Sequence, residues 1–290
     1  MDSLLGAFGL AQKIGLLKNG VKEVDHKTFD VVVYDGMSTD ETLRLLGSAS
    51  KSRLYLKYLR SLTEKTDVGR VIGPSIMSLV DELLTLSGSN SYKSGQTSSE
   101  IWTTLEKMLE RWSSNLSDPG RFGCVLMMDP SNPCSVNAAV RYWGCAIQAG
   151  AAVLGTIGAQ SPTQSEEEVR SKFKPLECVL LPQFVQENPP DWGVIMASNS
   201  SSNARAFFRS LMSVKESNIS PVKFDATKRA ITLFMPGFDK SEIKLFQYRG
   251  GSELLVEAGD QRRVISLPLN LQGKVAGAKF VERNLTITLR

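Results

Sequence analysis

The sequence has few of the features that identify common classes of enzyme and membrane protein. His26 is the only histidine, which argues against a Ser-His-Asp triad. Cys124, Cys134, Cys145 and Cys178 show no Cys-x-x-Cys spacing, so buried thiols in a reducing compartment are expected, and no metal site. The apolar runs are too short to span a bilayer. The net charge of +4 comes from scattered basic residues without interleaved aromatic residues, so nucleic acid is not expected as a partner.

A phosphate-binding loop is also absent. Neither Gly-Lys-Gly-Gly nor Gly-x-x-x-x-Gly-Lys-Ser/Thr occurs in the 290 residues. The backbone N–H groups and the lysine of such a loop cradle the β- and γ-phosphates of a bound nucleotide. We therefore expect this chain alone to hold no cofactor and to be inactive as an ATPase.

What is present is an ordinary globular composition, with 42% hydrophobic and 22% charged residues. Residues 121–129, 152–157 and 177–181 form short apolar runs, and residues 136–149 show a helical pattern between the first two. This alternation predicts an α/β fold with part of a doubly wound parallel sheet. Later, residues 231–289 show only strand patterns separated by turns, as in a β-sandwich.

The segment at residues 29–46 is the one around which we expect the first part to be organised. Residues 29–34 predict a strand buried on both faces, and the helix that begins at Glu41 has Thr39 or Asp40 as its N-cap. Between them, Asp35 enters a loop of small residues. This arrangement places a carboxylate near Mg²⁺ and phosphate in α/β NTPases, or Asp35 merely caps the helix.

The same segment resembles the second switch of the ArsA/Get family, the arsenite-pump ATPases and the ATPases that target tail-anchored membrane proteins. Asp35 and Thr39 match residues of that switch, and residues 42–46, Thr-Leu-Arg-Leu-Leu, match its closing run. Gly36-Met-Ser replaces Thr-Ala-Pro, and Asp40-Glu41 replaces Gly-His. The resemblance implies an ATP- and Mg²⁺-dependent family and a chain that corresponds to the C-terminal part of a longer, N-terminally truncated protein.

Further sites follow from this resemblance alone. The turn of Asp129, Pro130 and Asn132 matches a loop beside the adenine, and Gln160 matches a second one; a turn that starts a helix is the alternative for residues 129–132. A helical insertion at about residues 51–118 corresponds to the client groove, or its apolar stripes are simply core. The residues that we expect to face a client are Leu79, Leu83, Trp102, Leu105, Met108, Leu109 and Trp112.

The C-terminal strands resemble the α-crystallin domain of small heat-shock proteins. The matching segments are residues 233–243, 262–268 and 278–289, with Glu282-Arg283-Asn284 in place of Asn-Gly-Val. Asn284 is expected to adopt the positive φ of that turn. ArsA/Get proteins with such a sandwich are of the plastid and cyanobacterial type, which implies the chloroplast stroma or a cytosol-like reducing compartment. Small heat-shock proteins usually assemble through a C-terminal Ile-x-Ile/Val tail, which is not found after the last strand here. We therefore expect residues 220–290 to act in cis, packed against the α/β part or against a client held there.

These patterns together predict three regions: an ArsA/Get-like domain at residues 1–185, a linker at 186–219 and a sandwich at 220–290. The expected function is client binding or targeting with a degenerate nucleotide site, and the expected partners are hydrophobic client segments, including tail-anchored proteins. The alternatives are a competent ATPase when a P-loop segment is present, and a non-catalytic partner in a homo- or heterodimer.

Overall fold

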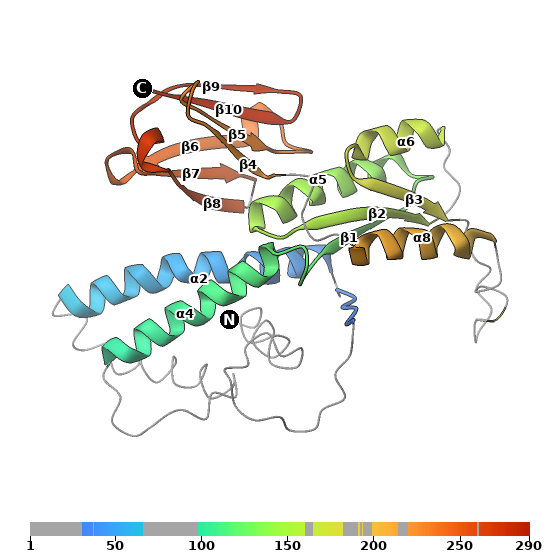
Figure 1. Ribbon diagram of the computed structural model, residues 1–290, viewed down its shortest axis with the longest axis horizontal. Helices are drawn as coiled ribbons and strands as arrows, with labels where there is room; N and C mark the ends of the chain where they lie inside the picture. Colours follow the sequence, from blue (N-terminus) through green and yellow to red (C-terminus); the bar gives the residue numbers. More distant parts are fainter. Residues whose placement is uncertain are drawn as a thin grey trace. The chain divides into compact units, whose positions relative to one another are not determined.

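The computed structural model describes residues 31–36, 38–65, 98–159, 165–181, 191, 193, 199–213, 220–259 and 261–290. The chain divides into two compact units, Met1–Leu116 and Ser117–Arg290, and Figure 1 labels the helices and strands of both. The division is far from the boundary predicted at residues 186–219. The physical reason is that the parallel sheet and the C-terminal strands belong to the same unit.

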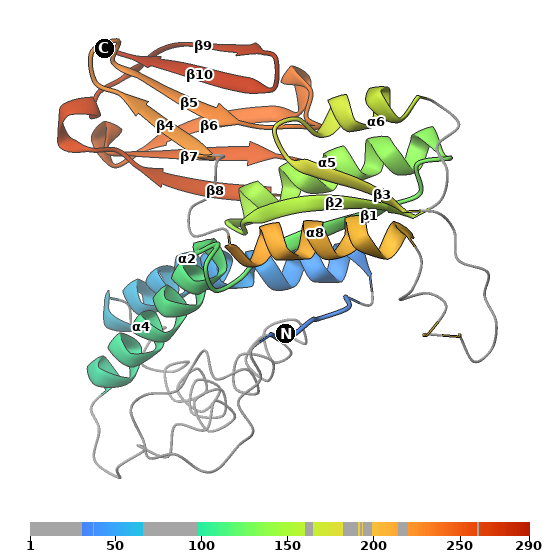
Figure 2. The ribbon, with the colours of Figure 1, turned by 45° about the vertical axis from the view of Figure 1, so that its right-hand side comes forward.

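The first unit contains helix α2 (Thr39–Lys65) and helix α4 (Ser98–Ser117), which ends at the boundary. The two helices lie side by side (Figures 1 and 2), and an ion pair of 3.4 Å joins Arg53 to Glu110. Leucine and tryptophan side chains of both helices are buried, namely Leu43, Leu46, Leu56, Trp102, Leu109, Trp112 and Leu116. The helix predicted to begin at Glu41 therefore continues without a break into the predicted helical insertion.

The prediction of a strand at residues 29–34 is wrong for residues 31–34, which are the part of this segment that the structure describes. Residues 31–34 are not in a strand, and Val33 is 88% exposed. A strand of a parallel sheet is buried only where neighbouring strands and helices cover it, and no described strand pairs with these residues. The N-cap is also different. Ser38 caps α2, because its Oγ accepts a hydrogen bond from the Glu41 backbone N–H at 3.2 Å.

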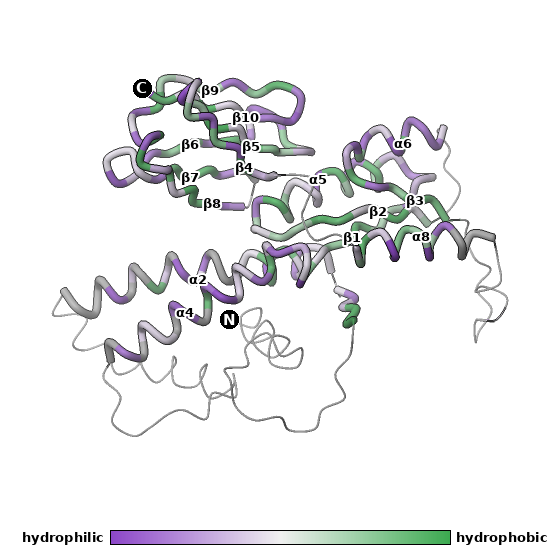
Figure 3. Tube along the Cα trace, in the orientation of Figure 1, coloured by the Kyte–Doolittle hydropathy of each residue, from purple (hydrophilic) through white to green (hydrophobic). Residues whose placement is uncertain are grey.

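The second unit begins with a parallel sheet of β1 (Cys124–Met128), β2 (Val153–Ala159) and β3 (Glu177–Leu181), in the order β1-β2-β3. Helix α5 (Pro133–Ala149) connects β1 to β2, and α6 (Glu166–Phe173) connects β2 to β3. Figure 3 shows hydrophobic residues concentrated along these strands. The predicted parallel α/β region is confirmed at this level.

Helix α8 (Asn199–Ser213) lies within the segment predicted as a linker, residues 186–219. Helices α5 and α6 cover one face of the sheet and α8 covers the other (Figures 1 and 2). Phe207 of α8 is buried in a cluster with Ile157 and Val179. The apolar side chains of residues 207 and 211 explain the difference, because they attach to the sheet a segment whose Ser/Asn-rich start suggested a loop.

The C-terminal strands form two antiparallel sheets, which confirms the predicted sandwich-like region. One sheet has the order β4-β5-β10-β9 and the other the order β6-β7-β8. Their bounds are β4 (Val222–Asp225), β5 (Ala230–Phe234), β6 (Ile243–Tyr248), β7 (Glu253–Ala258), β8 (Gln261–Ser266), β9 (Val275–Val281) and β10 (Asn284–Leu289). Alternate side chains fill the core, and Ile231, Leu254 and Ile287 are fully buried.

Two details of the sandwich differ from the sequence prediction. Strand β4 was missed, because its apolar/polar alternation extends over only four residues. The turn between β9 and β10 has positive φ at Glu282 (47°) and Arg283 (66°), whereas Asn284 is the first residue of β10. Two consecutive positive φ values are the requirement of a type I′ hairpin turn, so the strained positions lie one and two residues earlier than predicted.

Candidate functional site

The switch-like residues lie at the start of the first unit. Asp35 and Thr39 are both exposed. Ser38 Oγ accepts the backbone N–H of Glu41, and Thr42 Oγ1 donates to the Ser38 carbonyl at 2.8 Å. The local hydrogen bonds of this segment therefore begin a helix, and a role of Asp35 or Thr39 at a nucleotide stays a prediction.

The predicted adenine-side loop lies in the second unit, where it forms a closed turn. The Asp129 carboxylate accepts the backbone N–H of Ser131 at 2.8 Å, and Ser135 Oγ accepts the backbone N–H of Asp129 at 3.0 Å. Asn132 caps α5 through its side-chain oxygen, which accepts the Cys134 N–H at 2.9 Å. Pro130 is buried. The geometry favours the alternative of a turn that starts a helix; Gln160 lies outside the described residues.

The residues predicted to face a client present no open groove where they are described. Trp102, Leu109 and Trp112 are each at most 5% exposed. Leu79 and Leu83 lie outside the described residues, as do the side chains of Leu105 and Met108. The burial of the two tryptophans supports the alternative that this stripe is core.

The best-defined arrangement in the second unit joins α5 to the sandwich. Both terminal nitrogens of Arg141 donate to the Glu242 carboxylate at 2.7 Å, and Nη1 also donates to the Gly237 carbonyl at 2.9 Å. The guanidinium lies 4.0 Å from the ring centroid of Phe238. Hydrogen bonds from Arg141 and from the Asp239 backbone lower the pKa of Glu242. Burial is the largest single effect on the pKa of Arg141 and acts to lower it, but the hydrogen bond to Glu242 and the nearby negative charges together outweigh it, so the pKa is raised.

Apolar contacts continue along the same helix. The ring of Trp143, fully buried, meets Phe234 edge-on at 5.2 Å between centroids. At Gly144 the backbone approaches so closely that a Cβ would lie 2.0 Å from the Pro236 carbonyl oxygen. Gln148 Nε2 donates to the Phe234 carbonyl at 3.4 Å. The predicted packing of residues 220–290 on the α/β part in cis is thus present in the structure.

The outer face of the β6-β7-β8 sheet carries an apolar row that sequence reasoning missed. In the strand register Phe246 pairs with Leu255, and Leu255 with Val264. Phe246 is 42% and Val264 37% exposed, and Tyr248, on the same face, is 51% exposed. A solvated face of an antiparallel sheet is normally polar. Residues 245 and 246 are both apolar, a break in alternation that could have signalled two apolar faces.

Charged rows flank this apolar row. On one side Arg262 forms an ion pair of 2.8 Å with Glu257, which pairs in the register with Lys244. On the other side Arg249 reaches Glu253 at 3.0 Å. We call Phe246, Leu255 and Val264 with Tyr248 the outer apolar row. An exposed apolar surface with a charged rim is typical of a surface that binds another protein.

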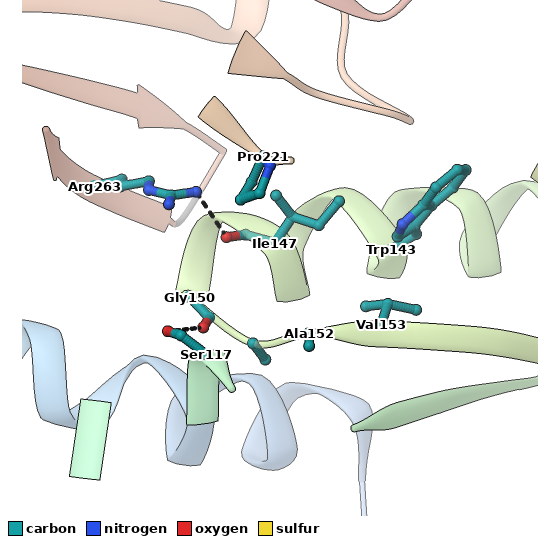
Figure 4. Close-up of a pocket in the computed structure, with 9 residues that line it drawn as sticks. Ser117, Trp143, Ile147, Gly150, Ala152, Val153, Pro221 and Arg263 are labelled. Carbon is teal, nitrogen blue, oxygen red and sulfur yellow. Dashed lines mark hydrogen bonds between the residues drawn. The ribbon is translucent and has the colours of Figure 1, made fainter. Parts of the chain in front are cut away.

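A small cavity lies where α5 ends against the sandwich (Figure 4). Its volume is about 90 Å³, and Trp143, Ile147, Val153, Pro221 and Arg263 are among its lining residues. Arg263 donates to the Ile147 carbonyl at 3.1 Å, and Ser117 Oγ donates to the Gly150 carbonyl at 2.7 Å. Burial lowers the pKa of Arg263.

The cysteines form no cluster in the described part of the chain. None of these four described residues forms a disulfide; Cys145 and Cys178 are buried as predicted, whereas Cys134 is exposed at the start of α5. Among the described side chains, no three His, Cys, Asp or Glu residues lie close enough together to hold a metal ion. None of the described helices is long and apolar enough to cross a membrane.

Comparison with known proteins supports one part of the sequence interpretation. Residues 226–289 match the family model of an HSP20-like domain found in ArsA. The match covers β5 to β10 and supports an ArsA-type protein with an HSP20-like domain. No curated protein matches the chain.

Proposed function

We propose that the chain is a client-binding module related to the ArsA/Get ATPases, and that its HSP20-like sandwich holds apolar client segments on the outer apolar row. The observation that carries the proposal is the row itself: three apolar side chains, paired across three strands, on the solvent face. The family match of residues 226–289 supports the relationship to ArsA. The expected clients are hydrophobic segments such as those of tail-anchored proteins.

The anchoring of the sandwich supports action in cis. Arg141 and Gly144 hold the segment at residues 236–242 against α5, so the outer apolar row belongs to the same compact unit as the parallel sheet. The chain sequence has no phosphate-cradling loop. Client binding by this chain alone is therefore independent of ATP and Mg²⁺.

Fluorescence anisotropy with a labelled leucine-rich peptide of about 20 residues, the length of one membrane span, tests this function. The full chain should bind the peptide, and Phe246→Ser with Val264→Thr should weaken binding about tenfold, because two exposed apolar side chains are lost. Leu269→Ser is the matched control: Leu269 is 87% exposed but lies outside the row. Equal weakening by the control, or none by the double variant, would remove the row from the function.

A further inference from the structure

The cavity at the end of α5 is lined by one buried hydrogen-bond donor without an acceptor and by an arginine that makes a single side-chain hydrogen bond to the described residues. Trp143 Nε1 is buried and has no hydrogen-bond partner there. Arg263 has five N–H donors, of which one reaches the Ile147 carbonyl at 3.1 Å. A buried donor without a partner destabilises the protein, so the cavity favours a group that brings acceptors.

The same place has an excess of positive charge. Within the described part of the chain, no carboxylate forms an ion pair with Arg263, although the neighbouring Arg262 pairs with Glu257. The carbonyl groups at the C-terminal end of α5 carry a partial negative charge, which offsets about half an elementary charge of the Arg263 guanidinium. A guanidinium that is partly removed from water is stable when an anion compensates the rest. Water could accept hydrogen bonds from the other N–H groups of Arg263, but it brings no negative charge.

We propose that this cavity binds a small oxyanion, a carboxylate or a phosphate group, through the Arg263 guanidinium and the Trp143 indole N–H. A cavity needs roughly 10–15 Å³ to hold one water, so about 90 Å³ has room for a group of several heavy atoms but not for a nucleotide. Arg263 and Pro221 come from the sandwich side, and Trp143 and Val153 from α5 and β2 (Figure 4). The bound anion therefore links the sandwich to the parallel α/β region.

The direct test is isothermal titration calorimetry of the full chain with sodium phosphate and, separately, with sodium acetate, at an ionic strength held constant with sodium chloride. One of the two anions should give a saturable heat at one site and raise the thermal midpoint, because a ligand that binds the folded state stabilises it. Tighter binding of phosphate identifies a phosphate group as the ligand, and tighter binding of acetate a carboxylate. No saturable heat with either anion would overturn the proposal.

Variants locate the site. Arg263→Gln should weaken the anion about tenfold or more, because a charge-assisted hydrogen bond is lost, and Trp143→Phe should weaken it by a smaller factor. Arg262→Gln is the matched control on the same strand, and it should bind as the unmodified chain does. If Arg263→Gln does not fold, Trp143→Phe and Arg263→Lys decide the result. Binding as tight in those two variants as in the control would contradict the proposed site.

Discussion

The contact between Arg141 and Glu242 should be the main polar attachment of the sandwich to α5. Both side chains are about one third exposed, at 29% and 36%, so the pair lies between a surface ion pair of about 0.2–1 kcal/mol and a buried one. Because two parallel bonds of 2.7 Å fix its geometry, we expect a coupling free energy of about 1 kcal/mol. Arg141→Ala should cost about 2–3 kcal/mol in all, since the bond to the Gly237 carbonyl and the contact with Phe238 are lost too.

A double-mutant cycle isolates the coupling from these other losses. Arg141→Ala, Glu242→Ala and the double variant are unfolded in urea and followed by circular dichroism, and the free energies of unfolding are compared. The cycle also cancels the bond that Glu242 accepts from the Asp239 N–H at 2.9 Å.

The matched control is Arg262 with Glu257, an ion pair of 2.8 Å confined to the sandwich, for which about 0.3–0.5 kcal/mol is expected. If the coupling free energy of the Arg141 pair does not exceed that of the control, the pair acts as an ordinary surface contact and is not the main polar attachment.

Three further predictions follow from single features. The pKa of Glu242 is lowered in the folded state, so the extra stability of the unmodified chain over Glu242→Gln should be complete above pH about 5 and decline as the pH falls below about 4. Urea unfolding at several pH values measures the difference in free energy of unfolding, and a difference that does not change with pH would contradict the prediction. Gly144→Ala should destabilise by about 1–3 kcal/mol despite alanine's higher helix propensity, whereas Gly277→Ala, with open space around it, should be neutral within about 0.5 kcal/mol. Arg283→Gly should stabilise by about 0.5–1 kcal/mol, because Arg283 has a φ of 66°; a lower thermal midpoint would contradict this.

The sequence predicted those helices and strands whose apolar side chains, spaced with the helical or strand period, are buried in the structure. Strand β3 has the predicted bounds, and α5 begins three residues earlier than predicted because Asn132 and Pro133 provide its cap and first turn. Residues 31–34 have the composition of a buried strand, but burial depends on neighbours that composition does not specify. The start of α8 reads as a linker because Ser and Asn favour loops, until Phe207 and Leu211 contact the sheet.

The candidate sites were less predictable, because they depend on register and on contacts between distant segments. The pairing of Phe246 with Leu255 and Val264 depends on the alignment of three strands, which local patterns do not define. Arg141 and Glu242 are 101 residues apart in the sequence, and neither belongs to a motif. The predicted client residues Trp102 and Trp112 show the reverse case, since an apolar helical stripe has the same pattern in a core and in a groove.

The most direct test of the proposed function is the affinity of the full chain for the labelled leucine-rich peptide, measured by anisotropy with and without Mg²⁺ and ATP. Saturable binding with the same dissociation constant is expected in both conditions, because the chain has no phosphate-binding loop to couple a nucleotide to the sandwich. A dissociation constant that changes about tenfold or more on addition of Mg²⁺ and ATP, or an absence of saturable binding, would contradict this expectation.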